Sequence, residues 1–306
     1  MTRDASLSAE AVNRRLLIGL PTLVLLALFA APTLIMVLAT FQFPDDFGGL
    51  APAWTRDAEG LRFDLTLENY ERFAGDTLYL RVFARSLWYA AITTVFCAIL
   101  AYPLAMAIAR APSRRRDVLV LLVILPFWSN FLIRVYAWMS ILGPRSAFTE
   151  AVNGLLGWVG LGPVTLLFTP FAVVVGLVYV HLPFMVLPLY ANLRRHDPAL
   201  LDASRDLGAG PWQSFRNVTL PMSMPGLLAG SLLVFIPALG AFAVPDILGG
   251  ARGTMIGNLI SDQFLSARDW PFGSTIAVIL TLFVVALAGL LAALARRVPG
   301  GAADAR

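Results

Sequence analysis

The stretch DPALLDASRDLGAGPWQSFRNVTLP, residues 197–221, is the longest polar interruption between strongly apolar segments in the C-terminal half of the chain. Asp197 is a residue type that caps helix N-termini, and Pro198 follows at the first helical position, where a missing N–H costs nothing. Apolar and small side chains then recur at helical spacing up to Leu207, and Gly208 can take the positive φ that ends a helix. The stretch therefore predicts a short amphipathic helix closed by a glycine.

A second short helix is predicted after Gly210, with Pro211 at its first position. Its apolar side chains share one face: Trp212, Phe215 and Val218. Pro221 is expected to break the backbone pattern before the next apolar run, because it has no N–H to donate. The element is thus predicted as helix, glycine turn and helix, presenting apolar side chains between two membrane spans.

This spacing resembles the cytoplasmic "EAA" loop in the membrane subunits of binding-protein-dependent ABC importers. That loop consists of Glu-Ala-Ala, three residues, Gly, nine residues, Ile, any residue and Leu-Pro. The corresponding positions here are Asp202-Ala203-Ser204, then Gly208, then Val218, Thr219 and Leu220-Pro221, at the same spacing. The departures are Asp202 for Glu, Ser204 for Ala and Val218 for Ile, all small changes.

In that family the loop forms a coupling helix that docks into a groove of the ATP-hydrolysing subunit. The resemblance implies the same coupling role for Asp202, Ala203, Ser204, Leu207, Gly208, Leu220 and Pro221. The alternative is an amphipathic helical loop that lies on the membrane surface. Motif matches are hypotheses, and here the position of the loop, the glycine and the Leu-Pro pair agree with the coupling role.

The composition excludes several classes of protein. A chain of 306 residues that is 58% hydrophobic and 14% charged, with a mean hydropathy of +0.75, is not a water-soluble domain. All 23 basic residues are arginines, so the lysine that a phosphate-binding P-loop needs is missing and the chain is not the ATPase. One cysteine, Cys97, forms no intrachain disulfide, and two histidines, His181 and His196, do not make a metal cluster.

Apolar runs of spanning length predict an all-α membrane protein with six transmembrane helices. They cover about residues 16–41, 86–109, 118–142, 164–190, 226–248 and 272–295. A cleaved signal peptide is the rival interpretation of the first run, which is too long for a signal core and continues past Ala30-Ala31. We expect a single permease domain over residues 1–306, with an ABC permease core at about 82–295.

The loops between the spans are polar. Residues 42–81 are acidic-leaning, with a short surface helix predicted at 65–73, and residues 143–163 and 249–271 are expected to be loops.

Arginines gather on one side of these spans. Fourteen of the 23 lie in the terminus, loops and tail on the side of the 197–221 stretch: Arg3, Arg14, Arg15, Arg110, Arg114, Arg115, Arg116, Arg194, Arg195, Arg205, Arg216, Arg296, Arg297 and Arg306. The positive-inside rule makes that side cytoplasmic. We therefore expect a multi-pass protein of the bacterial inner membrane with both termini, and the coupling loop, in the cytoplasm.

One arginine, Arg134, falls inside the third predicted span. An intramembrane charge marks a functional site by default, whereas near an interface it can snorkel or pair with an acid. Neighbouring aromatics could stack on an alkyl-ammonium solute or form an interfacial belt. Asp246, at the outer end of the fifth span, could meet a cationic solute. The candidate translocation path therefore contains Trp128, Asn130, Arg134, Tyr136 and Asp246.

Further segments resemble the spermidine/putrescine branch of these permeases. They are TLENYERF (66–73), PFWSNFLIRVYAW (126–138), HLPFMVLPLYANL (181–193), FIPALGAFAVPDILGG (235–250) and MIGNLISDQFLSARDWPFGS (255–274). The resemblance covers roughly residues 60 to 295. The branch commonly carries an acid in the Pro-Ala-Leu-Gly segment, where this chain has Ala241, so the solute stays open. Ferric iron, sulfate, and opine or amino-acid-derived solutes are moved by related permeases.

The resemblance implies a permease subunit that moves polyamines or a related solute by alternating access. It binds no cofactor itself and is not an enzyme, because ATP is used by a partner. The implied partners are ATP-binding ABC subunits, a second permease, an extracytoplasmic solute-binding protein and membrane lipid, without nucleic acid. An ion-gradient-driven secondary transporter is the alternative, although neither inverted repeats nor a buried acidic relay is evident, His181 apart. A membrane-embedded enzyme is the third alternative, but no convergent set of nucleophile, base or metal ligands is found within the predicted spans.

Overall fold

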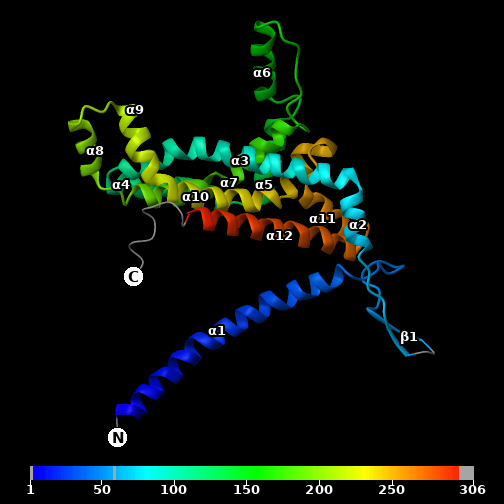
Figure 1. Ribbon diagram of the computed structural model, residues 1–306. Helices are drawn as coiled ribbons and strands as arrows, with labels where there is room; N and C mark the ends of the chain where they lie inside the picture. The colour runs from blue at the N-terminus through cyan, green and yellow to red at the C-terminus, as the bar shows by residue number, and fades with distance from the viewer. Residues whose placement is uncertain (1–2, 58–59, 296–306) are drawn as a thin grey trace. The chain divides into compact units, whose positions relative to one another are not determined.

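The computed structural model describes residues 3–57 and 60–295, and the regular elements of those residues are helical apart from one short β-hairpin (Figure 1). This agrees with the predicted all-α class. The arginines expected in the C-terminal tail, Arg296, Arg297 and Arg306, lie outside the described residues. By its contacts the chain divides into two compact units, one spanning Thr77–Ser261 and the other built from the residues up to Asp76 and from Asp262 onward. The single permease domain over residues 1–306 stays a prediction.

The unit that spans Thr77–Ser261 holds most of the helices. Its α-helices are α3 (Thr77–Arg110), α4 (Ser113–Ile124), α5 (Phe131–Ile141), α6 (Ala147–Trp158), α7 (Pro170–Leu193), α8 (Pro198–Asp206), α9 (Pro211–Ser214), α10 (Leu220–Leu239) and the start of α11 (Ile256–Leu265). Shorter turns connect them: the 3₁₀ turns η1 (Leu125–Trp128) and η4 (Gly250–Arg252), and the π turns η2 (Phe215–Thr219) and η3 (Pro245–Gly249).

The other unit contains α1 (Arg3–Ala39), β1 (Trp54–Asp57), β2 (Gly60–Phe63), α2 (Glu68–Gly75) and α12 (Trp270–Ala295). The two strands pair antiparallel, with Trp54 opposite Phe63. Asn69 of α2 donates to the carbonyl oxygens of Thr40 and Gln42, at 3.0 and 3.1 Å. These bonds hold the short helix α2 against the residues that follow α1.

The number of spans agrees with the prediction. Among the described residues, five helices are long and apolar enough to cross a membrane, and a bent pair makes a sixth if it is counted as one span. The five cover Pro21–Ala39, Thr77–Arg110, Pro170–Leu193, Pro211–Leu239 and Trp270–Leu290. Their apolar surfaces are partly exposed in the single chain, as expected for helices that face lipid or other subunits.

The third predicted span, residues 118–142, is not one straight helix. Ser113–Trp128 and Phe131–Ile141 meet at an angle of 91°. Pro126 has no N–H for the helix ladder, and Ser129 is extended with ψ 153°. Asn130 then caps α5, its side-chain oxygen accepting from the N–H groups of Leu132 and Ile133 at 2.8 and 3.4 Å. Hydropathy predicted the apolar run correctly but not this break, because a capping side chain and a proline barely change hydropathy.

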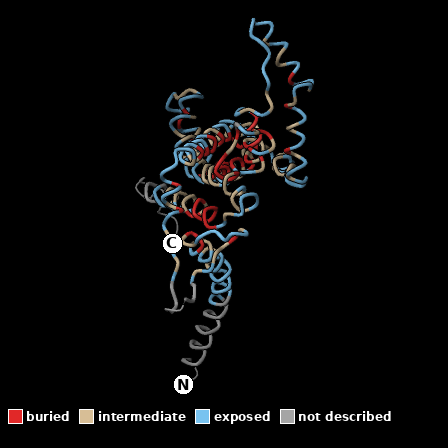
Figure 2. The backbone as a smooth tube through the Cα atoms, turned by 90° about the vertical axis from the view of Figure 1, so that its right-hand side faces the viewer, coloured by how far each residue is buried: buried red, intermediate tan, exposed pale blue. Residues whose placement is uncertain are grey.

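The predicted polar loops contain regular structure. Residues 143–163 hold α6, residues 249–271 hold η4 and α11, and residues 42–81 hold the hairpin before α2. The α6 arm projects across the direction of α3 and α10 (Figure 1) and is largely exposed (Figure 2). Asn153 closes the arm, because its carboxamide accepts from the N–H of Val164 at 2.8 Å and donates to the same residue's carbonyl at 3.2 Å.

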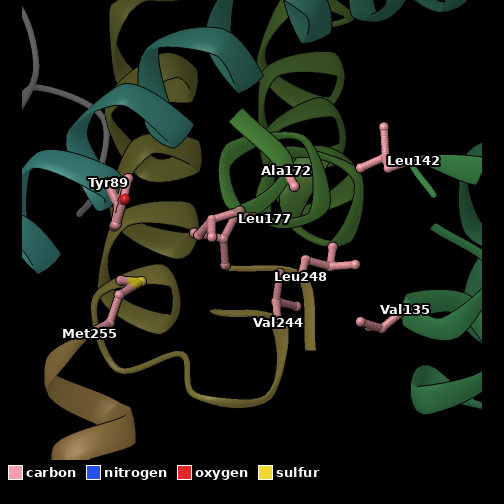
Figure 3. Packing of buried hydrophobic residues seen from close by; sticks show 9 residues of the cluster. Tyr89, Val135, Leu142, Ala172, Leu177, Val244, Leu248 and Met255 are labelled. Carbon is pink, nitrogen blue, oxygen red and sulfur yellow. The ribbon is translucent and has the colours of Figure 1, made fainter. Parts of the chain in front are cut away.

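The core of this unit lies between α3, α7 and α10, the helices that pack together most extensively. One cluster of buried side chains gathers near α5, η3 and the start of α11: Tyr89, Val135, Leu142, Ala172, Val173, Leu177, Val244, Leu248 and Met255 (Figure 3). A second lies toward the other end of the same helices: Cys97, Ala101, Ala105, Ile108, Met185, Val186, Leu189, Leu193 and Val234. This rigid bundle carries the 197–221 stretch at one end.

Glycine lets α10 approach α7 closely. A methyl group on Gly230 would lie 2.7 Å from Sδ of Met185, and one on Gly226 would lie 2.5 Å from Cβ of Asn192. Small residues at such crossings bring helix backbones together, which is how helices gain van der Waals contact in a membrane.

Candidate coupling loop and transport path

Helix α8 begins as the sequence predicts. Asp197 is its N-cap, and its carboxylate accepts from the N–H of Ala199 at 2.9 Å. Pro198 occupies the first helical position. The carboxylate satisfies one of the free N–H groups at the helix start and complements the positive end of the helix dipole.

The end of α8 is a glycine-closed Schellman turn. Gly208 has a φ of +81°, the left-handed conformation predicted for it. Its N–H donates to the carbonyl of Arg205 at 2.8 Å, and the N–H of Ala209 donates to the carbonyl of Ser204 at 3.0 Å. These two bonds satisfy carbonyl groups that the helix end would otherwise leave free.

Two serines join the arms on either side of this turn. The hydroxyl of Ser204 in α8 lies 2.8 Å from that of Ser214 in α9, and both residues are buried. The hydroxyl of Ser204 also donates to the carbonyl of Leu201 at 2.8 Å. In the next arm Gln213 accepts from the N–H of Gly210 at 3.0 Å, which fastens the start of α9. The loop is therefore a built, rigid element.

Large apolar side chains of the loop face outward. Leu207 is 89% exposed and Trp212 is 70% exposed, and Leu200 is also exposed. Asp202 forms an ion pair with Arg205 at 3.2 Å, with both side chains about two-thirds exposed, so the pair adds little stability. An exposed apolar surface on a rigid projecting helix is suited to a complementary protein groove.

Pro221 does not break the helix, contrary to the prediction. Residues Pro211–Leu239 form one continuous helical stretch, so the second helix of the loop is the beginning of the fifth span. The π turn Phe215–Thr219 lies directly before the proline, and the N–H of Leu220 donates to the carbonyl of Phe215. Hydrogen bonds between residues five positions apart widen the helix here, and the wider turn accommodates Pro221, which has no N–H to donate. The predicted span 226–248 thus begins earlier and ends at Leu239.

The aromatic face of this second arm is only partly as predicted. Trp212 stacks on Phe215, with ring centroids 5.3 Å apart, and Phe215 meets Tyr102 of α3 edge-on at 5.2 Å. Phe215 therefore packs toward the bundle, while Trp212 remains exposed.

Arg134 lies in α5 among aromatic rings. Its guanidinium carbon is 5.3 Å from the ring centre of Phe127 and 6.0 Å from those of Phe131 and Tyr179. Its Nε is buried and has no hydrogen-bond partner among the described residues. These three rings surround the guanidinium across the bend between η1 and α5, and they are not Trp128 or Tyr136, the aromatic side chains that the sequence placed in the candidate path.

The other candidate path residues lie close in the fold without forming one cluster of contacts. Trp128 and Tyr136 are exposed on η1 and α5, and the side chain of Asn130 serves as a helix cap. Asp246 is exposed in η3, a turn that packs against α5 and α7. The ion pairs of the described residues do not join Asp246 to Arg134. Likewise, no described group of three or more His, Cys, Asp or Glu side chains could hold a metal ion.

Comparison with protein families identifies the family to which this chain belongs. The family "Binding-protein-dependent transport system inner membrane component" matches residues 77–299. The chain belongs to this family. It is a multi-pass inner-membrane permease of an ABC importer, and the ATP-hydrolysing subunits and periplasmic binding protein are separate members of the complex. A permease of this family is not catalytic and carries no cofactor.

Curated relatives of the permease are similar over most of its length. It is 45% identical over 228 residues to the spermidine/putrescine transport system permease protein PotB of Escherichia coli, covering 74% of this chain and 81% of that protein. It is 42% identical over 236 residues to PotB of Haemophilus influenzae, with 76% and 81% covered. It is 35% identical over 260 residues to the inner membrane ABC transporter permease protein YdcU of E. coli, with 79% and 78% covered.

Solved structures support the permease fold. A bacterial ABC transporter involved in import of the acidic polysaccharide alginate superposes with a TM-score of 0.72 at 17% identity, covering 95% of this chain and 98% of that chain. The MetNI methionine ABC transporter gives 0.51 at 19% identity, with 69% and 91% covered. At these identities the likeness concerns the fold, and it confirms the importer-permease architecture expected from the sequence.

Two features of the site carried no sequence signal. Nothing in the sequence distinguishes Ser214 from other polar residues, and its contact with Ser204 depends on how α9 packs against α8. Likewise, Tyr179 is one of many aromatic residues in apolar runs, and its position beside Arg134 depends on the packing of α7. Helical spacing alone cannot pair residues on separate elements.

Proposed function

We propose that this permease imports polyamines of the spermidine and putrescine type. The observation that carries the proposal is 45% identity over 74% of the chain to a spermidine/putrescine permease. The aligned 228 residues are far longer than the 197–221 stretch, so the similarity is not confined to the coupling motif. Membership of the ABC permease family argues against the hypothesis of an ion-gradient-driven transporter. The second candidate function is import of another solute, such as ferric iron, sulfate, or an opine or amino-acid derivative.

The second candidate is favoured by one residue. Ala241 stands where related polyamine permeases commonly carry an acid, and its side chain packs against the buried cluster around Val244 and Leu248. This chain therefore offers a cationic solute no carboxylate at that position.

We propose further that residues 197–221 couple transport to ATP hydrolysis. Asp202, Ala203, Ser204, Leu207 and Gly208 form the helix and its turn, and Leu220-Pro221 joins it to the fifth span. Support comes from the rigid Schellman turn, the exposed Leu207 and Trp212, and the continuous helix from Pro211 to Leu239, which can transmit a movement of the loop to the membrane bundle. The groove that receives α8 would belong to the ATPase, with a second permease and bilayer lipid completing the surroundings.

Uptake of labelled putrescine and spermidine in cells with and without this chain tests both proposals, with the ATPase partner present throughout. Uptake is expected to fall on deletion and to return with the wild-type chain but not with Gly208→Asp, which should still insert into the membrane but places a negative charge at the carbonyl end of α8, where the helix dipole disfavours it. Unchanged uptake on deletion would overturn the polyamine assignment, and uptake of labelled ferric iron, sulfate and opines by the same two strains would then identify the solute. Full transport by Gly208→Asp would overturn the coupling role alone.

We propose that the path passes η1, α5 and η3, near Trp128, Asn130, Arg134, Tyr136 and Asp246. Support comes from the packing of α5 on η3 and from the exposed carboxylate of Asp246, which would attract an amine. Asp246→Asn should raise the KM for spermidine uptake about fivefold, the loss of ~1 kcal/mol for one contact between opposite charges near water. The matched variant Asp262→Asn, also an exposed acid, should leave the KM unchanged, and equal effects would refute the path.

A further inference from the structure

A pocket of about 320 Å³ lies where α3, α7 and the start of α8 meet. We call it the arginine pocket, after Arg110 at the end of α3 and Arg194 directly after α7, which both line it. Apolar side chains also line it, Met106, Leu193 and Leu201 among them. A pocket lined by apolar and cationic side chains matches a ligand that is both anionic and partly apolar.

No ion pair among the described residues neutralises the charge of these two arginines. The ion pairs there, such as Arg72–Asp269, Arg116–Asp117 and Arg205–Asp202, do not involve Arg110 or Arg194. Asp197 also lines the pocket, and its carboxylate accepts from the N–H of Ala199 as the cap of α8. Two guanidinium groups and one carboxylate thus line the pocket, and the carboxylate already accepts a hydrogen bond from a helix start.

A histidine completes the rim and fixes its shape. His196 lies between Arg194 and Asp197 in the short link between α7 and α8, and its Nε2 donates to the carbonyl of Met222 at 3.2 Å. That bond ties the link to the first turn of α10. Thr219, buried at the inner wall, adds a hydroxyl. The donors therefore come from separate elements that are held in register, as a binding site requires.

The position of the pocket indicates the source of its ligand. Arg110 and Leu193 mark the ends of two candidate spans on the arginine-rich side, which the positive-inside rule makes cytoplasmic, and the ends of spans are expected near the lipid headgroups. Basic pockets between helices on that side bind anionic headgroups, and the cytoplasmic leaflet is negatively charged. Basic residues at helix ends also complement the helix dipole, but that role needs no pocket shared by two helices.

We infer that the arginine pocket binds the phosphate of an anionic phospholipid from the cytoplasmic leaflet, with Arg110 and Arg194 as its ligands. The glycerol and the first carbons of the acyl chains contact Met106 and Leu193. Because Pro198 and Leu201 of α8 also line the pocket, the bound lipid supports the base of the candidate coupling helix. Lipid bound here therefore favours the orientation in which α8 meets the ATPase.

Retention of phosphatidylglycerol by the complete, purified transporter tests the site directly. The complex is placed in nanodiscs of phosphatidylcholine with or without phosphatidylglycerol, and bound lipid is counted by native mass spectrometry. Replacing one arginine by glutamine should weaken retention about fivefold, and Arg110→Gln with Arg194→Gln about 25-fold. The matched control is Arg195→Gln, which removes the same charge one residue away from a side chain that does not line the pocket. It should retain the lipid.

ATP turnover measured in the same nanodiscs is a second test, and its interpretation rests on the proposed coupling role. Lipid retention depends neither on that role nor on the identity of the solute. Phosphatidylglycerol should raise turnover of the wild type and of Arg195→Gln but not of the double variant. Arg110→Lys with Arg194→Lys keeps the charge and should keep most of the response, which excludes simple misfolding.

Three outcomes would overturn the inference. Equal lipid retention by the double variant and the wild type would show that the arginines do not bind lipid. Equal loss in Arg195→Gln would show a diffuse surface potential. If glycerol phosphate, added to nanodiscs of phosphatidylcholine alone, restored turnover as fully as phosphatidylglycerol does, the ligand would be a soluble phosphate instead of a lipid.

Discussion

Gly208 shows how one residue can control the candidate coupling element. Its φ of +81° is open to glycine and tolerated by asparagine and aspartate, but it costs most other L-residues about 1–2 kcal/mol. A side chain here would meet no atom within 4 Å, so the backbone conformation, and not space, limits substitution. The requirement is therefore specific to the turn.

Gly208→Val should uncouple transport, because a β-branched residue disfavours the Schellman turn and releases the end of α8. Gly208→Asn is the matched variant and should transport nearly as well as the wild type, since asparagine accepts the left-handed conformation. The measurement is the ratio of solute imported to ATP hydrolysed in proteoliposomes. Equal ratios for the two variants would show that the turn does not matter for coupling.

Arg134 is the second residue whose surroundings decide its role. Phe127, Phe131 and Tyr179 lie at cation–π distance from its guanidinium, and they belong to η1, α5 and α7. The side chain thus connects both arms of the bend to the central bundle. This gives the intramembrane charge a partner that hydropathy could not identify, namely the faces of three rings.

At the scale of elements, α11 approaches the end of α10 closely, backbone to backbone, near the candidate path. A methyl group on Gly257 would lie 2.5 Å from the carbonyl oxygen of Gly240 and 2.6 Å from that of Ala241. Asn258 fastens the same junction, donating to the carbonyl of Phe242 at 2.8 Å and accepting from the N–H of Met255 at 3.0 Å. The start of α11 is thereby held against the end of α10, which closes the connecting chain that contains η3.

Gly257→Ala should destabilise the permease by about 1–3 kcal/mol, because backbone atoms must move to admit the methyl group. Gly154→Ala in α6 is the control, since nothing lies within 4 Å of the added methyl group and alanine favours an exposed helix. Thermal unfolding of the two purified variants in one detergent compares them. A Tm for Gly257→Ala at or above that of Gly154→Ala would contradict this packing.

At the scale of the whole molecule, the distribution of arginine gives the permease its orientation. Fourteen of 23 arginines fall on the side of residues 197–221, and this count predicts a cytoplasmic coupling loop. The α6 arm is then extracytoplasmic, because one crossing, the bent pair, separates it from the loop between α3 and α4. Both the coupling proposal and the lipid site depend on this orientation.

Cysteine labelling tests the orientation with little background, because Cys97 is the only cysteine and is buried. Ala151→Cys in α6 should react with a membrane-impermeant maleimide in intact spheroplasts. Asp206→Cys in α8 should react only after permeabilisation. Both positions are exposed in the structure, so in cells that express the permease without its ATPase partner, which would cover α8, the membrane alone determines accessibility to the reagent. The reverse pattern would place the loop outside and exclude its contact with an ATPase.

Several features could be predicted from the sequence because neighbouring residues determine them. Long apolar runs, arginine counts, the cap at Asp197 and the turn at Gly208 depend on residues that are adjacent or a few positions apart. The number of spans, the α8 helix and its termination were therefore predicted correctly, and the spacing of the coupling motif indicated the family before any contact was known.

The remaining features depend on packing between distant residues. The 91° break at Asn130 and the π turn that accommodates Pro221 arise inside apolar runs, where hydropathy cannot distinguish a straight helix from a bent or widened one. The bond between Ser204 and Ser214, and the rings around Arg134, come from separate elements. The arginine pocket exists because α3 and α7 end at the same level, so two arginines far apart in sequence face one space. Local chemistry determined the elements, and only tertiary packing brought their side chains together.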